Sequence, residues 1–172
     1  TPVKVQLLGN DPDALAVNAQ RAIELGSPGV DLNFGCPAKT VNRSNGGAIL
    51  LRDTQILYEI TQAVREAVPA HYPVTAKMRL GYEDDQLALD NALALEAAGA
   101  SELAIHARTK TQGYKPPAYW EKIQPISQQL HIPVIANGEI WNAEQAQQCQ
   151  LQSGCSDLML GRGALTIPNL AK

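Results

Sequence analysis

One cysteine stands where an apolar segment gives way to a loop, in the stretch Gly-Val-Asp-Leu-Asn-Phe-Gly-Cys-Pro at residues 29–37. Gly35 allows a sharp turn and a close approach of the backbone, and Pro37 stiffens the chain directly after Cys36. We therefore expect the thiol at the mouth of a site and not in the core. Because no cluster of basic residues adjoins it in the sequence, a mostly protonated thiol is expected, which suits a proton donor better than a permanent nucleophile.

Polar residues also mark the carboxyl ends of six short apolar segments, at residues 3–9, 29–35, 73–81, 102–108, 133–139 and 157–163. A barrel of parallel strands takes one or two functional residues from each of many strand ends, so these positions are the candidates for chemistry. In chain order they are Gln6, Asn33, Lys77, His106, Asn137 and the pair Gly161–Arg162.

Lys77 has the most demanding of these positions, because a lysine on the inward face of a strand is unfavourable to bury without an anionic partner. A ligand that is anionic, or becomes so during reaction, accounts for it better than a side chain that only extends to the rim. Gln6 and His106 would add neutral hydrogen bonds to a polar planar ring. His71 and His131 lie in connections, and we expect them at the surface.

The last two segments each end in a glycine at a strand-to-helix turn, in Val-Ile-Ala-Asn-Gly-Glu-Ile (134–140) and Leu-Gly-Arg-Gly-Ala-Leu (160–165). Glycine lets backbone N–H groups approach a ligand closely, and the loops after the last two strands of a barrel commonly hold a phosphate. Arg162 would add a bidentate contact. The alternative is that these glycines only make tight turns.

The segments alternate with helical patterns, which predicts βαβ units and a parallel sheet. Helix ends are expected at Asp11–Pro12, Gly26, Gly99 and Asn142, the last with Gln145 in a capping box. A doubly wound sheet would carry a glycine-rich first turn, and residues 7–13 (Leu-Leu-Gly-Asn-Asp-Pro-Asp) are no such turn. We therefore predict a TIM (β/α)8 barrel that is incomplete, with about six parallel strands corresponding to strands 3–8.

The composition sets further bounds. The 172 residues carry a net charge of -3, which argues against a generally basic nucleic-acid binder and leaves a local basic face open. No apolar run reaches the ~20 residues of a membrane helix. The three cysteines, at 36, 149 and 155, have no metal-ligand spacing, and Cys149 and Cys155 are expected to be small buried hydrophobes. We expect a cytoplasmic monomer without a metal or a membrane anchor.

Five segments together resemble the bacterial tRNA-dihydrouridine synthases, most closely subfamily C. They are DLNFGCPAKTVNRSNGGAILL (31–51), VTAKMRLG (74–81), IHARTKTQGY (105–114), VIANGEI (134–140) and LGRGAL (160–165). The resemblance implies an FMN-containing TIM barrel that uses NADPH to reduce a uridine of the tRNA D-loop, with position 16 inherited from subfamily C. It covers essentially the whole chain.

Roles follow from the matched motifs as implications of this resemblance. Cys36 would donate a proton to the uracil ring. Asn33 and Arg108 would contact the target uridine. The residues expected to bind FMN are Gln6, Lys77 and His106 at the flavin ring, and Asn137, Gly138, Glu139, Gly161 and Arg162 at the ribityl chain and phosphate.

The distribution of basic residues agrees with a tRNA partner. Of the 14 lysines and arginines, eight fall on or just after strand ends: Lys39, Arg43, Lys77, Arg79, Arg108, Lys110, Lys115 and Arg162. A basic mouth on an acidic protein suits contact with a phosphate backbone. The uridine would have to leave its stack to reach the flavin.

Residues 1–172 are thus expected to form part of an FMN-binding catalytic domain. The two N-terminal βα units and the C-terminal helical tRNA-binding domain of the family are not recognised in the sequence. Two alternatives remain: an FMN barrel that acts on a free pyrimidine, of the dihydroorotate or dihydropyrimidine dehydrogenase type, and a catalytically inactive piece that binds phosphate or RNA.

Overall fold

The sheet of this protein contains six parallel strands in the order of the chain. The computed structural model describes residues 3–171. The strands are β1 (Val5–Leu7), β2 (Val30–Phe34), β3 (Val74–Arg79), β4 (Glu102–His106), β5 (Val134–Asn137) and β6 (Asp157–Met159). Their order β1-β2-β3-β4-β5-β6, with helices between them, is that of a TIM barrel with six of the eight strands. The predicted fold class is confirmed.

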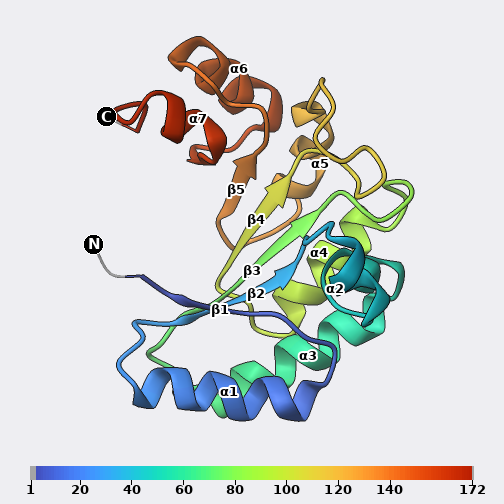
Figure 1. The fold of residues 1–172 in the computed structure, drawn as a ribbon, viewed down its shortest axis with the longest axis vertical. Helices are drawn as coiled ribbons and strands as arrows, with labels where there is room; N and C mark the ends of the chain where they lie inside the picture. The colour runs from blue at the N-terminus through green and yellow to red at the C-terminus, as the bar shows by residue number, and fades with distance from the viewer. Residues whose placement is uncertain (1–2, 172) are drawn as a thin grey trace.

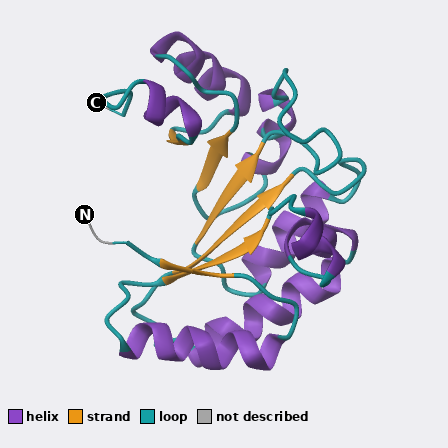
Figure 2. Ribbon diagram, in the orientation of Figure 1, coloured by secondary structure: helices purple, strands orange, loops and turns teal. Residues whose placement is uncertain are grey.

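Helices connect successive strands and cover the outer face of the sheet (Figure 1; Figure 2). The α-helices are α1 (Pro12–Glu24), α2 (Lys39–Arg43), α3 (Thr54–Ala67), α4 (Ala88–Ala97), α5 (Gln124–Ser127), α6 (Ala143–Ser153) and α7 (Arg162–Thr166). Two 3-10 helices, η1 (Gly47–Arg52) and η2 (Trp120–Lys122), complete the described part of the chain.

The expected helix ends are found where the sequence places them. Asp11 accepts a hydrogen bond from the Ala14 N–H at the start of α1, and Gly26 has a φ of +95° just after its end. Asn142 caps α6 by accepting from the Gln145 N–H. The Gln145 side chain, however, accepts from the N–H of Trp141 and not of Asn142, so the capping box is displaced by one residue.

The core lies between the outer face of the sheet and the helices. Val74, Ala76 and Met78 of β3 are all at most 1% exposed, so this face of the strand is part of the core. On α3, Leu57, Ile60, Thr61 and Val64 follow the helical repeat and are fully buried. Burial of each large apolar side chain stabilises the fold by about 1.5–3 kcal/mol.

The inner face of the sheet is unusually polar for a barrel. Asp31, Asn33, Thr75, Lys77 and Arg79 occupy it on β2 and β3, where most barrels place branched apolar side chains. On the remaining strands the same face carries Gln6, Ala104, His106, Ile135, Asn137, Asp157 and Met159. The interior of the sheet is therefore built for hydrogen bonding.

None of the helices within residues 3–171 has the length and apolar character needed to cross a membrane. The same residues contain no group of three or more His, Cys, Asp or Glu side chains that could hold a metal ion.

Candidate functional site

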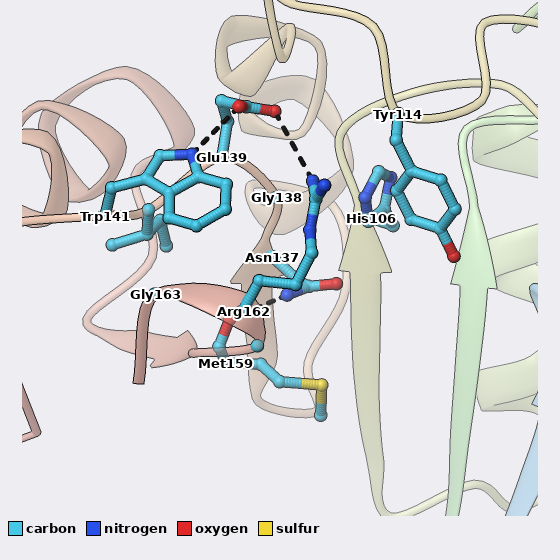
Figure 3. A pocket seen from close by; sticks show the side chains of 11 residues that line it. His106, Tyr114, Asn137, Gly138, Glu139, Trp141, Met159, Arg162 and Gly163 are labelled. Atoms are coloured by element: carbon cyan, nitrogen blue, oxygen red, sulfur yellow. Dashed lines mark hydrogen bonds and ion pairs between the residues drawn. The ribbon is translucent and has the colours of Figure 1, made fainter. Parts of the chain in front are cut away.

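An open cleft of about 260 Å³ lies at the carboxyl ends of β4, β5 and β6 (Figure 3). Six of the eight residues expected to bind a cofactor line it: His106, Asn137, Gly138, Glu139, Gly161 and Arg162. The structure therefore brings these six residues together at one cleft. The other two, Gln6 and Lys77, do not line the cleft. Lys77 is hydrogen-bonded to a residue that does, whereas Gln6 lies at another hollow.

Lys77 reaches the cleft through Asn137. The Lys77 Nζ donates a 2.9 Å hydrogen bond to Asn137 Oδ1, and Asn137 Nδ2 donates to the Met159 carbonyl at 2.7 Å. The two side chains meet over β4 because the register partner of Lys77 there is Ala104, which is small. The pKa of Lys77 is lowered from 10.5 to about 8, mainly by burial and also by the charge of Arg79, while the charge of Asp31 acts in the opposite direction.

His106 presents a neutral ring at the base of the cleft. Burial lowers its pKa to about 3, and the positive charges of Arg79, Lys77, Arg108 and Arg162 act in the same direction. The ring is 7% exposed, and among the described residues its buried Nδ1 has no hydrogen-bond partner. Because buried polar atoms are normally paired, this nitrogen is available for a polar ligand.

The turns after β5 and β6 leave room for a close approach. Gly138 has a φ of +122°, a conformation that side chains other than glycine rarely adopt, and its carbonyl is held by the Trp120 Nε1 at 2.7 Å. At Gly161 a Cβ atom would meet nothing within 4 Å, so the space beside that backbone is open. A phosphate bound at these turns stays a prediction.

Arg162 is held between two aromatic rings at the rim. Its guanidinium lies 5.0 Å from the ring centre of Tyr114 and 5.0 Å from that of Trp141, in cation–π range of both (Figure 3). About half of its side chain is exposed. Arg162 is thus positioned with its charge still accessible.

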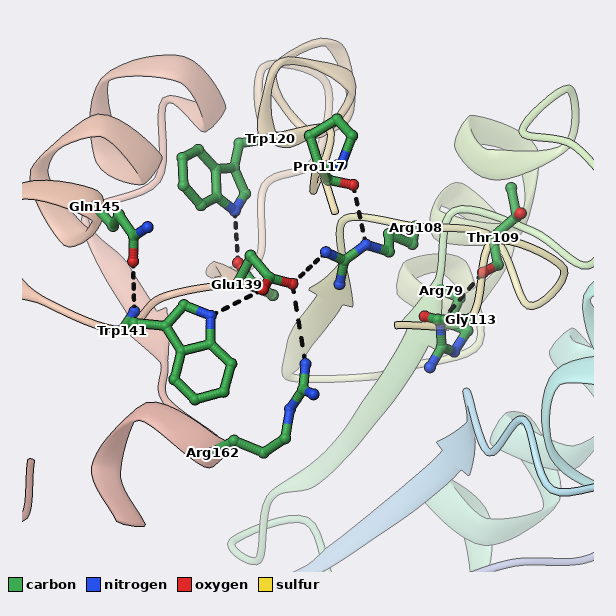
Figure 4. Close-up of polar contacts among 11 residues, drawn as sticks. Arg79, Arg108, Thr109, Gly113, Pro117, Trp120, Glu139, Trp141, Gln145 and Arg162 are labelled. Atoms are coloured by element: carbon green, nitrogen blue, oxygen red, sulfur yellow. Dashed lines mark hydrogen bonds and ion pairs between the residues drawn. The ribbon is translucent and has the colours of Figure 1, made fainter. Parts of the chain in front are cut away.

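Glu139 lies at the centre of a polar network behind the cleft (Figure 4). Its carboxylate accepts from Arg108 Nη2 and, at 2.8 Å, from Trp141 Nε1, while Arg162 Nη2 is 3.9 Å away. Burial alone would raise the pKa of Glu139, but the hydrogen bonds from Arg108 and Trp141, with the charges of Arg108 and Arg162, hold it below its ordinary value. The carboxylate orients cations here.

Arg108 has no exposed surface. Its Nε donates to the Pro117 carbonyl at 3.0 Å and its Nη2 to Glu139, so it ties the loop after β4 to the end of β5. A contact between Arg108 and a substrate stays a prediction, and this burial favours a structural role instead.

The Cys36 turn is held from both sides. Asn33 Oδ1 accepts from the N–H groups of Gly35 and Cys36 at 3.0 and 2.9 Å. The Cys36 carbonyl accepts from Asn42 Nδ2 at 2.9 Å and from the Ala48 N–H at 3.1 Å. The thiol-bearing residue is partly exposed, in contrast to Cys149 and Cys155, which are buried as expected.

Gln6 and Asn33 are joined to each other and lie away from the cleft. Asn33 Nδ2 donates to Gln6 Oε1 at 2.8 Å, and Gln6 Nε2 donates to Asp31 Oδ2 at 2.6 Å. Gln6 lines a separate hollow at the β1 edge. Contacts of Gln6 with a flavin, and of Asn33 with a uridine, remain predictions.

Arg79 connects the Cys36 turn with the cleft, whereas the sequence pattern placed it only on the basic rim. Its Nε donates to the Gly35 carbonyl at 2.9 Å, and its Nη1 to the carbonyls of Thr109 and Gly113. The guanidinium also lies 5.1 Å from the Tyr114 ring. Arg79 is 2% exposed and shares a strand face with Lys77, which was the signal for it.

Five further residues of the cleft were not singled out from the sequence: Tyr114, Ile140, Trp141, Met159 and Gly163. Tyr114 was part of the 105–114 segment, and Trp141 directly follows the 134–140 segment, so position next to a motif was the available signal. Met159 lies on the inner face at the end of β6.

A second hollow, of about 190 Å³, lies on the rim beside the Cys36 turn. Lys39, Asn42, Arg43, Tyr82 and Lys110 line it. The Lys110 ammonium is 4.6 Å from the Tyr82 ring centre, and the Arg52 guanidinium is 4.3 Å from it. Of the eight basic residues expected at the strand ends, Lys39, Arg43 and Lys110 therefore gather beside this hollow, whereas Arg79 and Arg108 are buried.

The chain is similar to curated proteins that share one name. The chain is 63% identical over 171 residues to the tRNA-dihydrouridine(16) synthase of Shewanella oneidensis, covering 99% of this chain and 54% of that protein. It is 57% identical over 173 residues to the protein of the same name from Escherichia coli, covering 100% of this chain and 55% of the relative. The chain spans about half the length of the curated relatives it matches.

Solved structures support the fold alone, because their identities are low. A 2-naphthoyl-CoA reductase is similar with a TM-score of 0.69 and 18% identity, over 91% of this chain and 27% of that one. A dihydrodipicolinate synthase family protein from Coccidioides immitis has a TM-score of 0.66 and 15% identity, over 96% of this chain and 55% of that one.

The family comparison covers every residue. The model of the dihydrouridine synthase (Dus) family matches residues 1–172, including the Cys36 turn and both glycine turns of the cleft. On this full-length match the chain belongs to the dihydrouridine synthase family.

Proposed function

We propose that the protein reduces a uridine of tRNA, at position 16, to 5,6-dihydrouridine, with FMN as cofactor and NADPH as reductant. The observation that carries this proposal is the cleft lined by six motif residues, which Arg79 connects, through Tyr114 and the Gly35 carbonyl, to the turn that bears the partly exposed Cys36. The position is taken from the names of the relatives.

The residues present fit FMN on three counts. The unpartnered Nδ1 of buried His106 can pair with a polar ring atom, and the open space at Gly161 beside Arg162 suits a phosphate. Lys77, held by Asn137, places a positive charge at the base of the site. A bound FMN would supply the two-electron reduction of the uracil double bond, with NADPH as the source of electrons.

Cys36 supplies the proton in this proposal. Reduction at one carbon of the double bond leaves the other to be protonated, and the Cys36 Sγ–H gives up that proton as a general acid. The thiolate that remains is stabilised by Arg79, whose guanidinium holds the Gly35 carbonyl of the same turn. Solvent then returns a proton to the sulfur, because the residue is partly exposed.

Two further groups prepare the site electrostatically. Lys77 carries its charge at neutral pH, since its pKa of about 8 lies above 7, and it stabilises negative charge that develops on a bound ring. Neutral His106 acts through hydrogen bonding and adds no charge. Arg108 and Glu139 hold the two loops that form the cleft wall.

The basic rim favours tRNA over a free pyrimidine. Lys39, Arg43 and Lys110 stand beside the Cys36 turn, outside the cleft, where a small substrate would not reach them. A polyanion that delivers one base to the cleft would contact them through its phosphates.

The test has three measurements on the purified protein. Quenching of flavin fluorescence during titration should show FMN binding, and NADPH oxidation should depend on unmodified tRNA. Turnover of free dihydropyrimidines in place of tRNA would favour the alternative enzyme class. Absence of FMN binding would contradict the proposal and favour an inactive RNA- or phosphate-binding role.

A further inference from the structure

Polar side chains on the inner face of β1, β2 and β3 form one continuous line of hydrogen bonds that ends at the cysteine turn. Thr75 Oγ1 donates to Asp31 Oδ1 at 2.7 Å, and Gln6 Nε2 donates to Asp31 Oδ2 at 2.6 Å. Asn33 Nδ2 donates to Gln6 Oε1 at 2.8 Å. Asn33 Oδ1 then accepts from the N–H groups of Gly35 and Cys36.

The two ends of this line fix its direction. An ionised carboxylate only accepts hydrogen bonds, and a backbone N–H only donates them. The Gln6 NH₂ group must therefore point toward the Asp31 carboxylate. As a result, the Gln6 amide oxygen points toward Asn33. Asn33 in turn must point its NH₂ group at Gln6, which leaves its oxygen for the turn. Both amides have one orientation that satisfies every partner.

We infer that Asp31 is a positioning residue for Cys36, because its carboxylate sets the orientation of the Gln6 and Asn33 amides and so locks the side chain that holds the Gly35 and Cys36 N–H groups. Asp31 lies five residues before Cys36 and reaches it through β1, the neighbouring strand. The importance of this positioning for catalysis rests on the proposed role of Cys36 as a proton donor. The hydrogen bonds that connect Asp31 to the turn do not depend on bound FMN or RNA.

The location of Asp31 agrees with this role. Its Cα is paired in register with Gln6 on one side and Thr75 on the other, so the side chain has a hydrogen-bond donor from each flanking strand. Thr75 is 3% exposed and anchors the carboxylate from β3. The other charged groups on this face of β2 and β3 are Lys77 and Arg79, and neither makes a hydrogen bond to Asp31 among the described residues.

Hydrogen exchange at the Gly35 and Cys36 amides tests the inference directly. In Asp31→Leu the line has no acceptor at its end, and exchange of these two amides should rise about fivefold, the ratio that one ordinary hydrogen bond gives. Asp31→Asn keeps an oxygen for Gln6, so exchange should stay within about twofold. Thr75→Val removes the bond to the other oxygen and should likewise leave the turn protected.

A general loss of stability is distinguished by amides elsewhere. Amides of Ile60 and Val64 in the buried face of α3 should not change in Asp31→Leu when the effect is local. Equal acceleration at the turn in Asp31→Leu, Asp31→Asn and Thr75→Val, or none in Asp31→Leu, would overturn the positioning role. Neither result depends on whether the protein reduces uridine.

A second test exchanges the residue types of positions 31 and 33, and it can be used even if Asp31→Leu does not fold. Asn33→Asp puts an acceptor-only group at both ends of the single Gln6 amide, so the melting temperature should fall by about 3 °C. Adding Asp31→Asn reverses the line with all bonds kept, and the melting temperature should recover. The single and the double variant both carry the new carboxylate at position 33, next to Lys77 on β3, so its charge does not distinguish them. A double variant that melts no higher than Asn33→Asp overturns the inference.

Discussion

Lys77 on β3 donates its hydrogen bond to Asn137 on β5, two strands away, across the small side chain of Ala104. Asn137 in turn binds the Met159 carbonyl of β6, so one lysine is linked to the last two strands of the sheet. The cleft thereby receives a positive charge at its base, from a lysine that the sequence analysis placed on the inward face of its strand.

The charge on Lys77 predicts a pH limit for flavin binding. The ammonium form is present below a pKa of about 8 and is lost as the pH rises above it. The dissociation constant for FMN should therefore increase about tenfold between pH 7 and 9.5, equivalent to one charge-assisted interaction. In Lys77→Met the affinity should be weaker and independent of pH over this range. Fluorescence titration at each pH measures both.

The lowered pKa of Lys77 has the opposite effect on stability: a rise in pH should weaken FMN binding but increase the free energy of unfolding. Burial lowers the pKa of Lys77 from 10.5 to about 8, so between these values the unfolded chain binds more protons than the folded one. The free energy of unfolding should therefore gain from this group as the pH rises from 8 to 10.5. Comparison of urea unfolding of the natural protein and Lys77→Met across this range isolates that gain.

His106 predicts acid sensitivity. Its pKa falls from 6.5 to about 3 on folding, so the contribution of the neutral ring is complete above pH 6.5 and is lost as the pH falls toward 3. His106→Asn should remove this part of the pH dependence between pH 3 and 6.5. An NMR titration that placed the His106 pKa near 6.5 would contradict the environment described for the ring.

Cys36 predicts a separation of cofactor binding from turnover. Cys36→Ala should bind FMN with unchanged affinity and lose at least about 10²-fold in the reduction of tRNA, the size of a general acid's contribution. Cys36→Ser keeps the shape of the residue with a weaker acid and should also fall in rate. Normal turnover by Cys36→Ala would show that another group donates the proton.

Replacement of Glu139 should lower the free energy of unfolding of the protein. Arg108 is fully buried, and Glu139→Gln would leave its charge without an anionic partner, which should destabilise the fold by about 3 kcal/mol. Urea unfolding measures this change. Glu121→Gln, at an exposed residue of η2, is the matched control and should stay within about 0.5 kcal/mol of the natural protein.

The rim residues predict the salt dependence of tRNA binding. Replacement of Lys39, Arg43 or Lys110 by glutamine should each lower the slope of log affinity against log salt by about 0.7–0.9 for every phosphate that the side chain neutralises. Arg21→Gln removes an exposed charge from the last turn of α1, away from the rim, and should leave the slope unchanged. An equal fall in all four variants would mean that tRNA senses net charge and not this rim.

The strand ends were predictable from the sequence because parallel strands bring their carboxyl ends to one edge. This placed His106, Asn137 and the Gly161–Arg162 turn in one cleft although up to 56 residues separate them. The turn at Cys36 was predictable as well, since Gly35 and Pro37 restrict the backbone on both sides of it. Local chemistry was sufficient for these features.

The position of Arg108 could not be obtained in this way. Arg108 closes the apolar segment 102–108, in which the period of two of a strand would give it the same face as His106, but β4 ends at His106. The Arg108 N–H bonds to the His106 carbonyl at 2.7 Å, so the chain turns there and the period of two no longer applies. The hydrogen-bond partners of Gln6 could not be predicted from the sequence either, because they depend on the register between β1 and β2.

Arg79 has a consequence for engineering of this protein. One guanidinium is bonded to Gly35 next to the thiol and to Thr109 and Gly113 in the following loop. Loops between elements usually tolerate insertions, but added residues at 109–113 would pull these carbonyls away and disturb a cysteine more than 70 positions earlier in the sequence. Insertions are therefore better placed at exposed Lys115 and Pro116, beyond the segment that this arginine holds.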